Sequence, residues 1–284
     1  MNERRKLWIS MSVALFGTSA VAEEPGPDAN PMTTNVAVIQ DSAHNPSQGE
    51  GEGEGGQTYA GEGEGEGEGA SPVDIKTDDP AYLTRLGLIR GHLKVGYSLY
   101  SEGHANMART HMKHPRDELY SGLVPAIEAR DGAPFDEPLT ALANSVESGA
   151  DQADVDAAYE ALDAAIRNAE DAADTTLQEE LLSIMGLLRT AGEEYAIGVD
   201  DGRLVNAHEY QDAWGFTQIA MKRLEELPAE QREQAPEVVA RVEGLIADLS
   251  DLWPELAPGD TVEGDASRLY GAAARVELAA LGLD

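Results

Sequence analysis

The chain has 284 residues, a formal net charge of −33 and no cysteine. This charge argues against nucleic acid as a partner, because phosphates would be repelled. The lack of cysteine excludes disulfides, thiolate metal sites and a lipoprotein anchor, so we expect an apolar core or a metal to hold the fold. The acidity attracts cations and equally fits a salt-adapted exported protein, so by itself it assigns no function.

Residues 1–22 have the pattern of a secretory signal peptide. Residues 4–6 are basic, residues 7–19 are apolar or small, and Ala22 ends a small-residue cleavage sequence. The apolar stretch is too short for a membrane helix, which needs about 20 apolar residues. We therefore predict an exported, periplasmic protein without membrane insertion.

Residues 23–78 lack apolar periodicity and contain two blocks of alternating glycine and glutamate, at 49–55 and 61–69. Such a sequence offers nothing to bury and has high backbone entropy. We predict a disordered, acidic Gly-Glu linker. It would serve as a solvated spacer or as a weak cation sponge beside the folded domain.

From residue 79 to residue 284 the composition changes to leucine, alanine and charged residues with helical spacing. We predict an all-α fold, a single helical bundle domain, with no convincing strand. The expected helices are 80–101, 104–113, 116–130, 136–148, 152–171, 175–199, 207–227, 235–252 and 264–282.

Four of the six histidines fall within residues 91–120, together with methionine, tyrosine and glutamate side chains. On a helix of about 100° per residue, His104, Met107, His111 and His114 share one face, whereas His92 lies off it. Individual histidines and methionines also occur as core packing, so the metal-site prediction rests on their density. The candidate metal ligands are His92, His111, His114 and Glu118, with His104, Met107 and Tyr97 as further candidates.

Pro115 follows this cluster and cannot donate a backbone hydrogen bond to His111. We therefore predict a helix break at His114-Pro115, with Glu118 one turn into the next helix and directed back toward the histidines.

The identity of the metal depends on which side chains join the histidines. Histidine with carboxylate and tyrosine suits iron, whereas histidine with methionine suits copper. Glu118 and the tyrosines favour iron, and Met107 keeps copper as the alternative. No nucleophile motif, phosphate loop or paired Glu-x-x-His motif is present in the cluster, so the sequence gives no support for an enzyme.

A second group of polar side chains surrounds a turn between two predicted helices, at residues 193–214. Gly202 is expected to cap the first helix, and Asn206 with Glu209 forms a capping-box pattern at the start of the second. Glu194 and His208 lie at the same end of this pair. Capping and packing explain the pattern without a ligand.

This hairpin also resembles a segment of the periplasmic helical extension of bacterial oxidase-dependent (Ftr-type) high-affinity iron permeases. The matching positions are Tyr195, Val199, Asp201, Gly202, Arg203, Val205, Asn206, Glu209 and Tyr210. The resemblance implies an exported helical domain in periplasmic iron handling, with an inner-membrane iron permease or another envelope protein as partner. No permease helices follow here and the REGLE-type membrane motif is absent, so the transport activity itself does not carry over.

Three functional hypotheses follow. The first is a periplasmic protein that captures or delivers a metal ion, iron before copper, through the histidine cluster. The second is an oxidase acting on the metal at the same site. The third is a non-catalytic helical scaffold that binds another envelope protein through its acidic surface.

Overall fold

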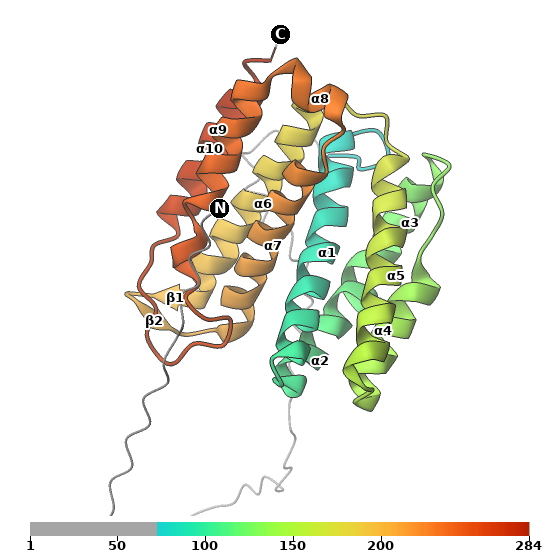
Figure 1. The fold of residues 1–284 in the computed structure, drawn as a ribbon, viewed down its shortest axis with the longest axis vertical. Coiled ribbons are helices and arrows are strands. Elements are labelled where there is room, and N and C mark those ends of the chain that lie inside the picture. The colour runs from blue at the N-terminus through green and yellow to red at the C-terminus, as the bar shows by residue number, and fades with distance from the viewer. Residues whose placement is uncertain (1–72, 284) are drawn as a thin grey trace, which may run out of the picture. The chain divides into compact units, whose positions relative to one another are not determined.

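The computed structural model describes residues 73–283, with the side chains of His114, Asp117 and Glu118 left out. The predicted signal peptide and the Gly-Glu repeats lie outside the described residues. Within them the all-α prediction is confirmed (Figure 1). The helices are α1 (Asp79–Ser101), α2 (Ala105–His114), the π-helical η1 (Pro115–Leu119), α3 (Tyr120–Glu128), α4 (Asp136–Ser148), α5 (Gln152–Asp171), α6 (Leu177–Gly198), α7 (Ala207–Glu226), α8 (Ala229–Gln234), α9 (Pro236–Ala247), the 3₁₀ turn η2 (Ser250–Leu252) and α10 (Ser267–Ala280).

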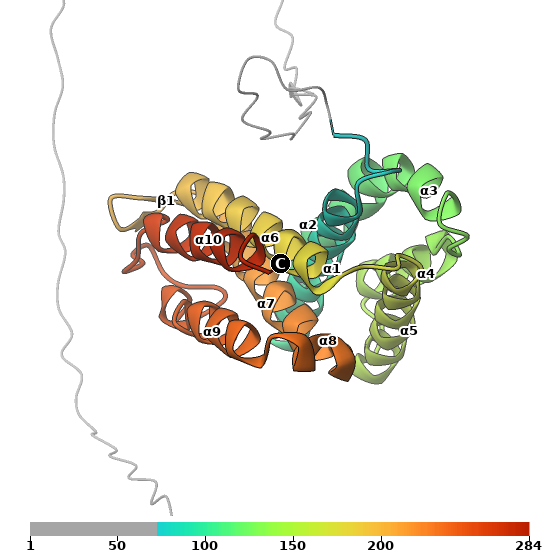
Figure 2. The same ribbon diagram turned by 90° about the horizontal axis from the view of Figure 1, so that it is seen from above.

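The apolar side chains form two clusters. One is built by α1 to α5 and the other by α6, α7, α9 and α10. Figure 2 shows α1 between the two groups of helices, and Trp214 of α7 packs against both clusters. The contact between α1 and α7 therefore lies between the two apolar clusters. None of the helices within residues 73–283 is long and apolar enough to cross a membrane.

Helices α1 and α7 approach each other most closely at two glycines. A Cβ atom added to Gly215 would lie 2.5 Å from the carbonyl oxygen of Gly91, and one added to Gly91 would lie 2.4 Å from the ring of Phe216. A similar contact occurs between α1 and α2, where a Cβ on Gly96 would lie 2.7 Å from Met112 Cε. Because glycine has no side chain, the backbones of α1, α2 and α7 can pack closely.

The turn after α6 differs from the sequence prediction. Residues Val199–Asp200 (β1) and Arg203–Leu204 (β2) pair as a short antiparallel hairpin, although we predicted no strand. Asp201 and Gly202 both have positive φ, 48° and 74°, as a type I′ hairpin turn requires. Gly202 therefore forms the hairpin turn, and the prediction that it caps the helix is wrong.

The predicted helix break at Pro115 is also wrong in part. Helix α2 ends at His114 as expected, but the chain continues through the π-helical turn η1 directly into α3. Pro115 keeps helical angles, with φ −58° and ψ −40°. The wider π-turn accommodates the backbone hydrogen bond that proline cannot make.

A buried group of charged residues joins α1 to α5 and α7. Arg90 is 1% exposed and donates to Asp163 at 3.1 and 3.2 Å, to Glu170 at 2.8 Å and to Glu226 at 3.1 Å. Lys222 donates to the other oxygen of Asp163 at 2.9 Å. Burial by itself raises the pKa of Asp163, but the two cations outweigh it and hold the pKa below its ordinary value.

We expect Gly215→Ala to lower the free energy of unfolding by about 1–3 kcal/mol, because the added methyl group meets the backbone of α1. The matched control is Gly271→Ala in α10, where no atom lies within 4 Å of the added Cβ. That change should raise stability by about 0.5–1 kcal/mol. Urea unfolding of both variants measures the difference, and equal effects would contradict the close contact.

Asp163→Asn should destabilise the protein by about 1–3 kcal/mol near neutral pH, because Arg90 and Lys222 lose a shared anionic partner while Arg90 keeps Glu170 and Glu226. A lowered carboxyl pKa stabilises the folded state above the unfolded pKa of about 3.9, and this contribution is lost as the pH falls further. The difference in the free energy of unfolding between wild type and variant should therefore narrow below about pH 4. Asp171→Asn, at the exposed end of α5, is the control. A gap that stays constant from pH 7 to pH 3 would contradict this account.

Candidate metal centre

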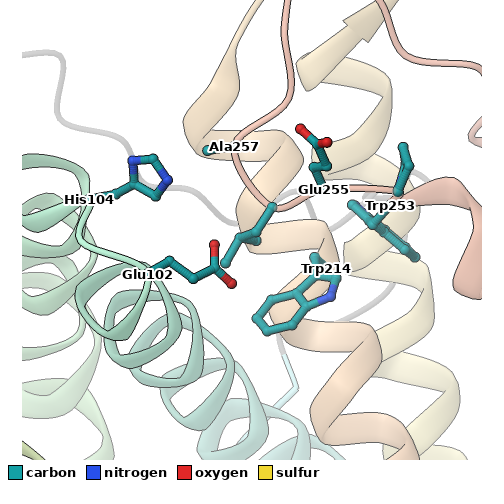
Figure 3. A pocket seen from close by; sticks show the side chains of 8 residues that line it. Glu102, His104, Trp214, Trp253, Glu255 and Ala257 are labelled. Atoms are coloured by element: carbon teal, nitrogen blue, oxygen red, sulfur yellow. The ribbon is translucent and has the colours of Figure 1, made fainter. Parts of the chain in front are cut away.

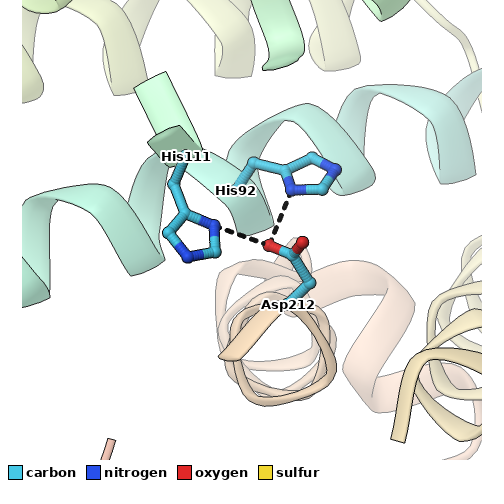
Figure 4. A group of neighbouring side chains, drawn as sticks. All are labelled: His92, His111 and Asp212. Carbon is cyan, nitrogen blue, oxygen red and sulfur yellow. Dashed lines mark hydrogen bonds and ion pairs between the residues drawn. The ribbon is translucent and has the colours of Figure 1, made fainter. Parts of the chain in front are cut away.

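Asp212 of α7 lies at the centre of the candidate site and is 1% exposed. Its Oδ1 atom is 2.7 Å from His92 Nδ1 of α1 and 3.0 Å from His111 Nδ1 of α2 (Figure 4). Its Oδ2 atom is 3.0 Å from Nδ1 of His208, one turn earlier on α7. Three imidazoles from three helices thus face a single buried carboxylate.

The glycine contacts explain how these side chains meet. Gly91 and Gly215 bring α1 against α7. Gly91 directly precedes His92 in the sequence, and Gly215 lies shortly after Asp212. Gly96 brings α2 against α1 at Met112, the residue after His111. Close backbone packing therefore fixes the separation of the three side chains.

Gln211 determines which nitrogen of His111 carries a proton. Its amide nitrogen donates to the carbonyl of Leu256 at 3.1 Å, and its Oε1 atom lies 2.9 Å from His111 Nε2. Because that oxygen can only accept, His111 Nε2 must be the protonated nitrogen. A neutral His111 then directs the lone pair of Nδ1 at Asp212 Oδ1, so that two acceptors face each other.

Two further carboxylates lie beside His208. Glu209 is 3.5 Å from His208 Nδ1, and its carboxyl group hydrogen bonds with that of Glu194 on α6. Burial first, and then the nearby charge and hydrogen bond of Glu209, raise the pKa of Glu194 to about 8. Burial lowers the pKa of His208, but its hydrogen bonds with Asp212 and Glu209 outweigh this and raise it to about 10.

The ligand atoms form two overlapping groups, each within 4.8 Å. One consists of His92, His111 and Asp212, and the other of His208, Glu209 and Asp212. Imidazole nitrogen and carboxylate oxygen are donors that bind divalent iron, zinc and manganese.

Part of the chain matches a known family. Residues 172–278 match the iron permease-associated 4-helix bundle domain. The resemblance seen in the hairpin sequence is confirmed for this region, which contains α6, α7, α9 and α10. No curated protein and no solved structure matches the chain.

The candidate site extends beyond the iron permease-associated bundle. Glu194, His208, Glu209 and Asp212 lie inside the matched region, whereas α1 and α2, which carry the other two histidines, precede it. Tyr195 and Tyr210 are among the hairpin positions that carry the family resemblance. Both are buried and pack with Trp253 in the bundle core.

The structure brings together only some of the sequence-predicted ligands. His92 and His111 converge on Asp212, and Met107 lies near them, with its sulfur 3.8 Å from Gln211 Nε2. Tyr97 instead stacks on Tyr159 of α5, with 4.2 Å between ring centroids. The side chains of His114 and Glu118 lie outside the described residues, so their role stays a prediction.

His104 is exposed at the start of α2 and lines a separate hollow of about 380 Å³ (Figure 3). Glu102 and Glu255 also line this hollow, which is walled by Trp214 and Trp253. Leu256 belongs to the same wall and holds Gln211 through its carbonyl. The hollow therefore lies next to the residues that orient His111.

Sequence reasoning missed Asp212 and Gln211 and placed His208 at the start of a capped helix without a metal-binding role. Asn206 does cap α7 by accepting from the backbone of His208, but Glu209 takes its hydrogen bond from the Asn206 side chain, so the predicted capping box is incomplete. The available signal was the spacing of His208 and Asp212, which puts a base and an acid on one helix face.

Proposed function

We propose that this protein is an exported, periplasmic iron-binding protein that captures or delivers the ion in partnership with an iron permease. The ion would be bound by His92, His111 and Asp212. The match to an iron permease-associated bundle supports iron handling. The signal-peptide pattern of residues 1–22 supports export.

The orientation of His111 is the observation that carries the metal-binding part of the proposal. Gln211 fixes a proton on Nε2, so in the neutral form of the ring Nδ1 and the Asp212 carboxylate, 3.0 Å apart, would face each other as two acceptors. Either an additional proton or a cation must lie between them, because two buried acceptors in contact are unfavourable. Metal-binding histidines are commonly held this way, with the other ring nitrogen donating to an oxygen.

The donor set favours iron over copper. Two imidazoles and a carboxylate suit a borderline divalent ion, and soft sulfur ligands select Cu(I). The sulfur of Met107 lies 3.8 Å from Gln211 Nε2. Two exposed carboxylates at the neighbouring hollow, Glu102 and Glu255, would attract cations toward this side of the molecule.

We expect His111→Ala to weaken Fe(II) binding by more than tenfold and Gln211→Leu to weaken it by about 10–100-fold, since the latter removes the group that orients the imidazole. Binding is measured anaerobically on the untagged chain after desalting. His104→Ala is the matched control, because this histidine is exposed and lies outside the ligand groups. It should bind iron like the wild type.

Wild-type retention of iron by His111→Ala, with unchanged circular dichroism, would reject the proposed site. Equal losses in His111→Ala and His104→Ala would instead indicate diffuse binding by the acidic surface. Metal analysis of the protein purified from its native envelope separates iron from copper as the physiological ion. This last measurement is needed because copper binds most nitrogen and oxygen sites more tightly than iron in vitro.

A further inference from the structure

We propose that this centre holds two cations, with Asp212 bridging an inner ion at His92 and His111 and an outer ion at His208 and Glu209. The inference rests on the proposed function, because the inner ion is the one already assigned. It adds a second ion position on the opposite oxygen of the same carboxylate.

The two oxygens of Asp212 face different nitrogen donors. Oδ1 is approached by His92 and His111, and Oδ2 by His208 at 3.0 Å. The rings of His111 and His208 are stacked almost parallel, with centroids 4.2 Å apart and an interplanar angle of 4°. Each ring therefore faces a different oxygen of the same carboxylate, and two neighbouring ions, about 3.5–4 Å apart in two-metal sites, would each bind one imidazole.

The Oδ2 atom of Asp212 would be the bridging oxygen for the second ion. It is buried, and His208 Nδ1 lies 3.0 Å from it, at ion-pair distance and without a well-aligned hydrogen bond. A cation between Oδ2 and His208 Nδ1 would take the place of the imidazole proton.

The charges around the outer position favour cations. Asp212, Glu209 and Glu194 meet there, and among the described side chains His208 is the basic partner of the first two, with no lysine or arginine in an ion pair with any of the three. Glu194 of α6 can act as a further oxygen donor. Several carboxyl groups that share one imidazole offer oxygen ligands to a metal ion.

The two positions differ in their access to solvent. The His208 and Glu209 side chains are 28% and 27% exposed, whereas those of His92 and His111 are 7% and 1% exposed. The outer ion should therefore exchange faster than the inner one. In a protein that captures or delivers iron, this outer position would be the first to load and the first to release its ion.

The test is the number of Fe(II) ions retained per chain after anaerobic loading and desalting. Wild type should retain two, and His208→Ala and Glu209→Gln should each retain one. Glu237→Gln is the matched control, since Glu237 also lies in the first turn of its helix, α9, and is exposed. It should retain two.

Cobalt(II) loading gives a second measurement that does not depend on counting. Two Co(II) ions sharing a carboxylate couple magnetically, so wild type should lose paramagnetic resonance intensity per ion relative to singly loaded His208→Ala. Equal intensity per ion in the two proteins would overturn the bridge.

The outcomes separate the two proposals. One retained ion in wild type that His208→Ala leaves in place overturns the second position and keeps the proposed function. Two ions that survive both His208→Ala and Glu209→Gln also overturn it. No retained ion in wild type rejects both.

Discussion

A carboxylate buried in the centre of the protein is the constraint on which the rest of the site depends. Asp212 is almost fully covered, and among the described side chains only imidazoles lie within ion-pair distance of it. Burial alone raises the pKa of this acid, but the surrounding histidines hold it well below its usual range. The anion must therefore be balanced by protons on the imidazoles or by metal ions, and Gln211, which accepts from Nε2 of His111, leaves Nδ1 of that ring to face the carboxylate.

Most of the fold could be predicted from the sequence because its helices are long and periodic. The long helices, α1 among them, begin and end within a few residues of the expected bounds. The errors lie in short elements. The Asp201-Gly202 turn forms a hairpin because both residues adopt positive φ, and Pro115 continues a helix because a π-turn absorbs its missing donor. Such local choices depend on one or two residues and leave no periodic pattern.

The site was only partly predictable. Histidine density pointed to His92 and His111, but the shared helix face did not bring His104 to the same point, and Tyr97, a further candidate, instead donates to Asp156. The carboxylate that unites the histidines lies 120 residues from His92 in the chain. Its position follows from the contact between α1 and α7, which depends on glycines whose role becomes visible only when the helices are packed.

The location of the donors on both sides of residue 172 affects how this bundle can be used as a module. A fragment that begins at residue 172 would keep α6 to α10 with His208, Glu209 and Asp212 but would lose His92 and His111. Proteins recognised only through this bundle can therefore share its architecture and differ in the side chains that meet at this carboxylate. Whether helices with suitably placed imidazoles precede the bundle is the feature to compare among them.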